Sequence, residues 1–297
     1  MPNGIIIIDK PAGWTSMDVC AKLRGILHEK RVGHAGTLDP MATGVLPVFV
    51  GQATKAVSFA ENGRKVYEAV LQLGRVTDTQ DTTGETLEEH AVTVTADDVR
   101  AALPRFLGEI EQIPPMYSAI KVNGQKLYDL ARQGKEVARK PRRITIYDLA
   151  LTEELGNGQY ALRVECSKGT YIRTLCHDIG QKLGCGAAMA QLVRTRSGMF
   201  SLEDAVTLKQ TEELRDAGTL EEHILSVKQI LSYLPAFICG KDHEKALMNG
   251  NQLKPGWGKA PQGIAETMMV LDSEENLIGV YEWKKNTGML HPKKMFL

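Results

Sequence analysis

The stretch that decides the fold is Gly33-His34-Ala35-Gly36-Thr37-Leu38-Asp39-Pro40-Met41-Ala42-Thr43-Gly44-Val45-Leu46-Pro47. Three glycines and two prolines in these fifteen residues exclude a regular helix or a central strand, so we expect an ordered loop. The proline after Asp39 favours an extended backbone there, which holds the carboxylate away from the chain. The residues alone leave two interpretations open: Asp39 closes a turn, or it is the carboxylate of a site.

Length and composition indicate a two-part protein without cofactor. The 297 residues exceed the usual single core and predict one large and one small domain. Lys+Arg and Asp+Glu both total 36, so any nucleic-acid surface must come from local clustering. Five cysteines without a close pair argue for a reducing compartment and against structural zinc. The sequence contains no phosphate-binding loop or dinucleotide fingerprint, and we expect neither cofactor nor metal.

The flanks of the loop predict buried strands and a helix. The β-branched run Ile5 to Ile8 predicts a strand buried on both faces, and residues 45–50 predict another. Thr15 and Asp18 form a capping-box signal for a helix with its apolar face at Val19, Leu23, Ile26 and Leu27. Lys10, directly after the first strand, is either a solvated strand end or a site residue.

Residues 65–107 predict a strand, an acidic turn and a helix. The strand spans residues 65–73, and its Tyr67 is either core packing or a site residue. Residues 78–89 hold five acids and no base, but their spacing misses a calcium loop, so we expect a solvated turn facing away from any RNA. The capping pair Thr95 and Asp98 predicts a helix interrupted at Pro104.

The segment 121–143 is strongly basic. It contains eight basic side chains and two acidic ones, a net charge of +6 in a chain of net charge zero. Tyrosines lie within and beside it, which suits phosphate contact and base stacking, although a charge run is often only a solvated face. The basic residues are Lys121, Lys126, Arg132, Lys135, Arg139, Lys140, Arg142 and Arg143.

A second candidate site segment follows the strand predicted at residues 159–166. Ser167-Lys168-Gly169-Thr170 leads into a helix with its apolar face at Ile172, Leu175, Ile179 and Leu183. Tyr171 and Arg173 lie in the first turn of that helix, where side chains can point into a cleft. Cys176 and His177 have no partner at helical spacing, so we interpret them as packing or rim residues rather than metal ligands.

The C-terminal part predicts a small domain. Residues 207–233 read as one helix that ends before Pro235, where we place the domain boundary. A short helix at residues 242–249, a hairpin at residues 268–283 and a basic tail follow. The apolar run near the start of the chain is too short for a signal peptide or a membrane span, so we expect a cytoplasmic protein.

The central loop resembles the catalytic motif of the tRNA pseudouridine synthase B family, Gly-His-x-Gly-x-Leu-Asp-Pro-x-Ala-x-Gly, and every fixed position is present at residues 33–44. The string Ser-Lys-Gly-Thr-Tyr-Ile-Arg at residues 167–173 matches the family's second motif. Element types alone allow α/β or α+β. The resemblance implies an α+β fold with a central, mainly antiparallel mixed sheet flanked by helices. It also implies a catalytic domain at 1–234 with an RNA-clamping insertion at about 115–146, and a short β-rich PUA-like RNA-binding domain at 235–297.

The resemblance also implies roles for single residues. Asp39, Tyr67 and Arg173 would be catalytic, with Arg173 as the natural partner of Asp39. His34, Tyr171, Leu192 and Lys10 would bind the substrate, His34 by stacking in the gap left by a flipped uridine. RNA contacts would come from Lys121, Lys126, Arg132, Arg139, Lys140, Arg142, Arg143 and Arg194. Val193 departs from the family, which shows arginine there.

The implied activity is isomerisation of uridine-55 to pseudouridine in the tRNA T-loop. The reaction breaks the N1–C1′ bond and joins C5 to C1′ without redox chemistry or a donor, so it requires no cofactor. Asp39 could attack C6 or C1′ or stabilise an oxocarbenium-like centre, and the sequence does not choose among these. The partner would be the T-stem-loop, with no membrane, no obligate protein partner and a monomeric chain. The alternatives are a non-catalytic RNA-binding protein or tRNA-folding chaperone, and a glycoside hydrolase, which usually needs two carboxyls.

Overall fold

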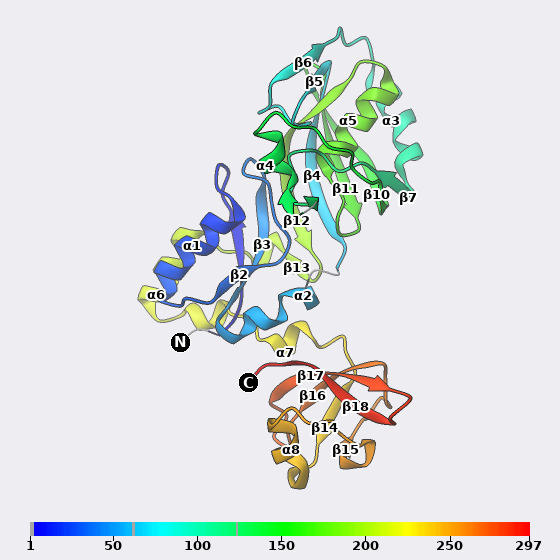
Figure 1. Cartoon of the computed structure of the whole chain (residues 1–297). Coiled ribbons are helices and arrows are strands. Elements are labelled where there is room, and N and C mark those ends of the chain that lie inside the picture. The colour runs from blue at the N-terminus through cyan, green and yellow to red at the C-terminus, as the bar shows by residue number, and fades with distance from the viewer. Residues whose placement is uncertain (1–2, 61–62, 123) are drawn as a thin grey trace.

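The computed structural model describes residues 3–60, 63–122 and 124–297 (Figure 1). Asn123, inside the predicted basic segment, and residues 1–2 and 61–62 of the predicted catalytic domain lie outside the described residues. None of the helices in the described ranges is long and apolar enough to cross a membrane.

A nine-stranded sheet forms the larger part of the molecule. Its main path runs β1 (Gly4–Lys10), β3 (Thr43–Val50), β12 (Ala187–Ser197), β4 (Lys65–Leu73), β11 (Gln159–Cys166), β10 (Arg142–Gly156) and β7 (Gly108–Gln112). Two short strands, β2 (Val32–His34) and β13 (Phe200–Ser201), pair with β3 and β12. All pairs are antiparallel except β12 with β3, so the predicted mixed, mainly antiparallel sheet is confirmed.

Helices pack against this sheet through their apolar faces. The helices α3 (Ala96–Ala102) and α5 (Ile172–Leu183) pack on one face, where strand and helix side chains form a single buried cluster (Figure 1). The helix α1 (Ser16–Leu27) begins at the predicted Thr15–Asp18 capping box and buries its apolar face against β1 and β3. The four-residue helix α2 (Val57–Ala60) follows β3.

The parallel contact between β12 and β3 requires glycine. Gly44 has a positive φ of 98°, and a Cβ at that position would lie 2.3 Å from the Arg194 carbonyl oxygen. Any side chain would therefore push β12 away from β3. Since β3 begins just after the central loop, this glycine sets the distance between that loop and the strands β12 and β4.

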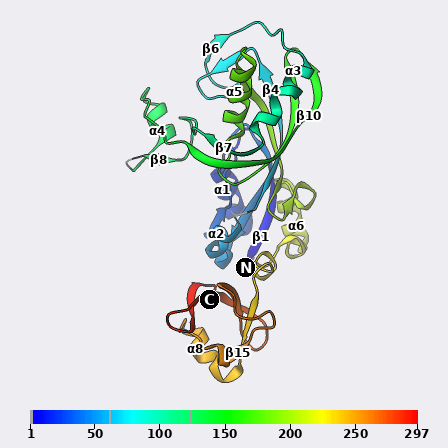
Figure 2. The same ribbon diagram turned by 90° about the vertical axis from the view of Figure 1, so that its right-hand side faces the viewer.

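Two small hairpins extend from the main sheet. The first pairs β5 (Arg75–Thr77) with β6 (Thr86–Glu89) and encloses part of the acidic turn. The second pairs β8 (Lys121–Val122) with β9 (Gln125–Lys126) and leads into α4 (Leu127–Ala131). We call residues 115–141 the arm; it projects from the body of the molecule in Figure 2 and has a small apolar cluster of its own around Met116, Leu127 and Leu130.

The segment predicted as one helix at residues 207–233 is broken, so that prediction is wrong. The helix α6 (Leu208–Ala217) ends at Gly218, whose left-handed backbone (φ 76°) stops it. A 3₁₀ turn at residues 220–223 follows, and a second capping box at Ser226 starts the short helix α7 (Val227–Ile230). The apolar residues of this segment are spaced as in a helix, but Gly218 ends the first helix and the capping residues at Ser226 start another.

The C-terminal part is β-rich, as predicted. Its sheet runs β15 (Gly258–Lys259), β14 (Ala236–Cys239), β16 (Thr267–Leu271), β17 (Leu277–Lys284) and β18 (Met289–Met295), with α8 (Glu244–Met248) between β14 and β15. The predicted hairpin is the β16–β17 pair. This sheet lies at the end of the molecule opposite α3 and α5 (Figures 1 and 2). It shares a buried cluster with β1 and β3, and the predicted boundary at Pro235 stays a prediction.

Candidate active site

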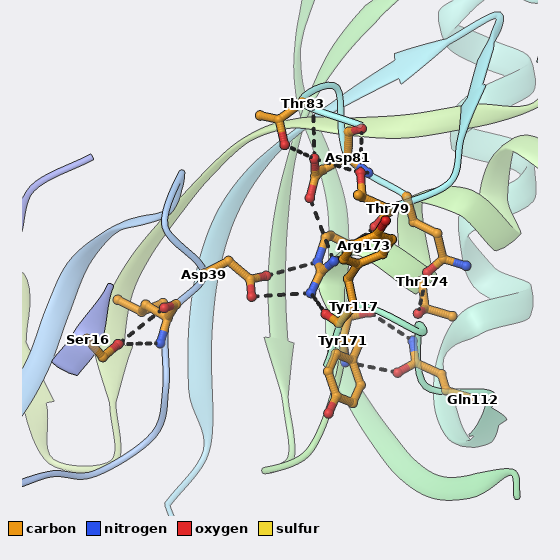
Figure 3. A network of polar contacts seen from close by, with 12 residues as sticks. Ser16, Asp39, Thr79, Asp81, Thr83, Gln112, Tyr117, Tyr171, Arg173 and Thr174 are labelled. Carbon is orange, nitrogen blue, oxygen red and sulfur yellow. Dashed lines mark hydrogen bonds and ion pairs between the residues drawn. The ribbon is translucent and has the colours of Figure 1, made fainter. Parts of the chain in front are cut away.

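The loop between β2 and β3 is held in place at several points. The Ser16 hydroxyl accepts from the Leu38 amide at 2.9 Å and donates to the Leu38 carbonyl at 3.2 Å. The carbonyl of Pro40 accepts from the Gly13 amide at 2.8 Å and from Lys10 Nζ at 3.2 Å. These contacts fix the residues on both sides of Asp39, so its carboxylate is presented by a rigid backbone, with Ser16 behind the loop (Figure 3).

Asp39 forms a two-point ion pair with Arg173 from the start of α5. Arg173 Nε lies 2.9 Å from one carboxylate oxygen, and a terminal nitrogen lies 3.2 Å from the other. The Arg173 side chain is 5% exposed, while that of Asp39 is 35% exposed. The guanidinium also donates to the carbonyls of Thr79 and Tyr117 at 2.9 and 2.8 Å. The predicted pairing is confirmed, and Asp39 keeps an open side toward solvent.

A second carboxylate, Asp81, lies on the other side of Arg173 (Figure 3). Its oxygen is 3.7 Å from Arg173, and its side chain is 8% exposed. The other oxygen accepts from the hydroxyls of Thr79 and Thr83 at 2.9 and 2.5 Å. The prediction of a solvated turn is therefore wrong at Asp81, which is buried, and the prediction that the turn faces away from any RNA stays a prediction. An aspartate among threonines looks like an ordinary turn, and the sequence gives no sign of its distant partner.

The backbone of Tyr171, which caps α5, is clamped by Gln112 at the end of β7. Gln112 accepts from the Tyr171 amide at 3.0 Å and donates to its carbonyl at 3.2 Å. Gln112 is 1% exposed, so water does not compete for these bonds. Sequence reasoning missed this residue because a glutamine before a Pro-Pro turn carries no signal of its own. Its contacts fix the direction in which α5 presents Tyr171 and Arg173.

The residues around Asp39 enclose a cavity of about 250 Å³. Five residues predicted as catalytic or substrate-binding line it: Asp39, Tyr67, Tyr171, Arg173 and Leu192. They come from the central loop, β4, α5 and β12, so the site lies across the middle of the sheet. Ser118 and Ala119, at the base of the arm, complete one wall together with Thr37, Lys65 and Thr170. A cavity of this size has room for one pyrimidine base.

Tyr67 and Arg194 form the floor beneath the loop. Burial raises the pKa of the Tyr67 phenol, and the Arg194 guanidinium beside it opposes part of that rise. Arg194 is completely buried and donates to the carbonyls of Val45 at 2.7 Å and Gly36 at 2.9 Å. A phosphate contact requires exposure, so the predicted RNA contact at Arg194 does not fit. Its position ties β12 to the central loop instead.

Two predicted substrate residues, Lys10 and His34, do not line the cavity. Lys10 is fully buried behind the loop, where burial lowers its pKa to about 8. His34 lies in β2 and is half-buried. Burial lowers the pKa of its imidazole, and the positive charge of the nearby Arg194 lowers it further. Lys10 thus supports the loop from behind. A stacking role for His34 stays a prediction.

The basic residues of the arm and the start of β10 are mostly exposed. Two of them contact acids: Arg139 reaches Glu136 at 2.9 Å, and Arg143 reaches Glu109 at 3.4 Å. Lys126 and Arg132 both approach the ring of Tyr128, at 5.2 and 5.6 Å from its centroid. The remaining cations, Lys121, Lys135, Lys140 and Arg142, are exposed. They leave a positive, aromatic-bearing surface beside the cavity.

Within the described ranges no group of three or more His, Cys, Asp or Glu side chains could hold a metal ion. All five cysteines are free and buried. Cys176 lies on the buried face of α5 and packs in the core, in agreement with its interpretation as a packing residue.

Comparison with known proteins identifies relatives along the whole chain. Residues 24–172 match the family model described as TruB family pseudouridylate synthase (N terminal domain). Residues 173–232 match the tRNA pseudouridylate synthase B C-terminal domain. The tRNA pseudouridine synthase B of Lachnoclostridium phytofermentans is 48% identical and covers 99% of this chain and 100% of its own. That of Bacillus cytotoxicus is 43% identical over 99% of this chain and 97% of its own.

Solved structures with the same fold are also found. A Cbf5-Nop10-Gar1 complex contains a chain with a TM-score of 0.76 and 28% identity, covering 99% of this chain and 85% of that one. An H/ACA RNP bound to a substrate RNA containing 2′-deoxyuridine contains another, with a TM-score of 0.74 and 26% identity, covering 99% and 85%. The α+β fold with a β-rich C-terminal part is therefore shared with these proteins.

Proposed function

This chain belongs to the TruB family of pseudouridylate synthases and is an isomerase, and from that membership we propose that it converts uridine-55 in the T-loop of tRNA to pseudouridine. The relatives that cover the full chain are named for tRNA, which supports tRNA as the substrate.

The observation that carries the proposal is the Asp39–Arg173 pair at the wall of a base-sized cavity. Asp39 is 35% exposed, so it can reach a bound molecule, whereas the buried Arg173 holds its direction. A carboxylate held in one position can act as the nucleophile that attacks an electrophilic carbon. Asp81 is buried behind Arg173, which supports Asp39 rather than Asp81 as the reacting acid.

We propose that the reaction proceeds as an isomerisation on the enzyme. The N1–C1′ bond breaks with participation of Asp39, by attack at C1′ or C6 or by stabilising a positive C1′. The uracil then turns and C5 bonds to C1′. C5 loses its proton and N1 gains one, so that the atoms balance without a donor. Tyr67 lines the cavity, and burial raises the pKa of its phenol, so the ring there carries no charge. We propose that it stacks on the base or takes part in proton transfer.

We propose that the target nucleotide enters the cavity by base flipping. A uridine in a folded T-loop cannot reach Asp39 while it is stacked. Leu192 and Tyr171 at the cavity wall offer apolar and aromatic surface for the extruded base. The exposed cations of the arm support contact with the phosphates of the T-stem-loop.

We further propose the catalytic domain at residues 1–234 and the PUA-like domain at 235–297, each with its own sheet. The chain would act as a monomer in the cytoplasm, on tRNA and without an obligate protein partner.

The test of this proposal is to map pseudouridine in unmodified tRNA after incubation with the purified chain. Carbodiimide adducts followed by primer extension locate pseudouridine to a single nucleotide. A single stop at the T-loop uridine is the expected result. Stops only elsewhere would contradict the T-loop assignment, and tRNA binding without any stop would favour the tRNA-folding chaperone.

A further inference from the structure

The hydroxyl of Ser118 is a buried polar group in the cavity wall that lacks a hydrogen-bond partner. Ser118 is 5% exposed, and its Oγ has no partner within the described part of the chain. Burial raises the pKa of the Tyr171 phenol, and an interaction with the Ser118 hydroxyl opposes part of that rise. The two hydroxyls do not, however, form a hydrogen bond of ordinary geometry. Buried hydroxyls are nearly always bonded, so an unmet one in a binding cavity indicates a place for a ligand atom.

The backbone around Ser118 is fixed on both sides. The Ser118 amide donates to the Met116 carbonyl at 2.9 Å, and its carbonyl accepts from the Tyr128 amide of α4 at 3.1 Å. The preceding carbonyl, of Tyr117, accepts from Arg173 at 2.8 Å (Figure 3). Only the side-chain hydroxyl of Ser118 is therefore left to bond something else, and its direction is set by the arm and by α5.

Several other polar groups of the cavity wall are already engaged. Asp39 and Arg173 bind each other, and the Thr170 hydroxyl donates to the Ser167 carbonyl at 2.9 Å. Lys65 also has a partner. A uracil presents two carbonyl oxygens and one N–H along its Watson–Crick edge, and a bound uracil must satisfy them after leaving water. A serine hydroxyl can donate one hydrogen bond and accept others, so it matches that edge.

We propose that the Ser118 hydroxyl hydrogen-bonds the Watson–Crick edge of the flipped uracil, which makes Ser118 a substrate-binding residue. The inference rests on the proposed function. When the uracil turns to exchange N1 for C5, its O2 and O4 exchange places and N3–H stays on the axis. The edge therefore presents the same order of acceptor, donor and acceptor before and after the turn, so the Ser118 hydroxyl keeps its partner in both orientations. The arm thus contributes one contact to the base itself.

The test compares wild type, Ser118→Ala and Ser118→Thr in the full chain. The RNA probes are two otherwise identical T-stem-loops, one with uridine and one with an abasic site at the target position. Loss of one neutral hydrogen bond predicts about 10-fold weaker binding of the uridine RNA by Ser118→Ala, with a matching loss of kcat/KM. Affinity for the abasic RNA should be unchanged. Ser118→Thr, which keeps the hydroxyl, should recover most of the affinity for the uridine RNA.

Two further variants guard against an indirect effect. Ser58→Ala removes an exposed hydroxyl from α2 and should behave as wild type. Ser118→Cys keeps the side-chain volume with a poor hydrogen-bonding group and replaces the alanine variant if the latter unfolds. Equal affinity of wild type and variant for the uridine RNA would overturn the inference, and so would an equal loss for both RNAs, which indicates a displaced arm. Absence of isomerisation by wild type would instead overturn the proposed function, and the binding comparison would still decide the role of Ser118.

Discussion

Arg173 binds both carboxylate oxygens of Asp39, at 2.9 and 3.2 Å. This ion pair joins a loop near the start of the chain to a helix 134 residues later. The same guanidinium reaches Asp81 and two backbone carbonyls. A planar donor with five N–H groups is the side chain that can make these contacts together. The geometry of the Asp39 carboxylate therefore depends on one arginine.

Arg173→Lys should abolish most of the activity while leaving tRNA binding close to normal. Lysine keeps the positive charge but cannot bind both oxygens of Asp39 as the guanidinium does. The loss of these charge-assisted hydrogen bonds predicts a drop in kcat of about 100-fold. Single-turnover rates and tRNA affinity measured on the same preparations separate the two effects. Arg163→Lys, in the half-exposed pair with Asp148, is the matched control and should retain activity. Wild-type kcat in Arg173→Lys would refute the positioning role.

Asp81→Asn should lower kcat by about 10-fold, because Arg173 loses the second anion that holds it in place. The amide oxygen of asparagine can still accept from Thr79 and Thr83, but its NH2 group then replaces the oxygen that faces Arg173. Because two donors then face each other in a buried place, the free energy of unfolding should also fall, by about 1–3 kcal/mol. Steady-state kinetics and urea denaturation measure the two quantities. Asp148→Asn, at a half-exposed carboxylate, provides the comparison. A lower tRNA affinity with unchanged kcat would argue against this role.

Much of the site could be predicted from sequence because it lies in two dense motifs. The glycines and prolines around Asp39 dictate a loop whatever the rest of the chain does, and alternation placed Tyr67 on the inner face of β4. The pairing of Asp39 with Arg173 followed from their chemistry. Local signals of this kind act over a few residues, so they can be read without knowing the fold.

The residues that escaped prediction act through distant partners. Asp81 and Gln112 look like ordinary loop residues, and their roles arise only where β5–β6 and β7 approach α5. The resemblance implied an RNA contact for Arg194, but the parallel contact of β12 with β3 buries it. The break at Gly218 was missed because the apolar period continues across it.

Because Lys10 is buried, the free energy of unfolding should depend on pH in the alkaline range. Burial lowers its pKa to about 8 in the folded protein, against an ordinary value of 10.5. Between these values the unfolded chain binds the extra proton, so the contribution of Lys10 to the free energy of unfolding rises with pH. Below pH 8 the lysine is charged in both states, and its burial cost is constant. The difference in unfolding free energy between wild type and Lys10→Met should therefore shift in favour of wild type between pH 8 and 10.5.

Urea denaturation of both proteins at pH 7.5, 9 and 10 measures this shift, since other titrating groups cancel in the difference. A difference that does not change with pH would show that Lys10 keeps its ordinary pKa. Lys10→Met should also slow the reaction, because Lys10 Nζ anchors the Pro40 carbonyl beside Asp39.

The arm predicts a salt-dependent contribution to tRNA binding. Lys140→Ala and Lys121→Ala should each weaken binding several-fold and reduce the slope of log affinity against log salt by about 1, as expected for one lost phosphate contact. Filter binding across a salt series measures the slope. Lys209→Ala removes an equally exposed charge from α6 and should leave the slope unchanged. Identical slopes for the arm variants and Lys209→Ala would place the phosphate contacts elsewhere.

The most direct measurement is release of tritium from unmodified tRNA carrying 5-tritiated uridine, because bonding of C5 to C1′ expels that atom. Wild type should release tritium to the extent of one uridine per tRNA, while Asp39→Asn and Asp39→Ala should release none above background and still bind tRNA. Release by Asp39→Asn at the wild-type rate would contradict the assignment of the reaction to this carboxylate. Binding without release by all three proteins would identify a tRNA-binding protein that has no synthase activity.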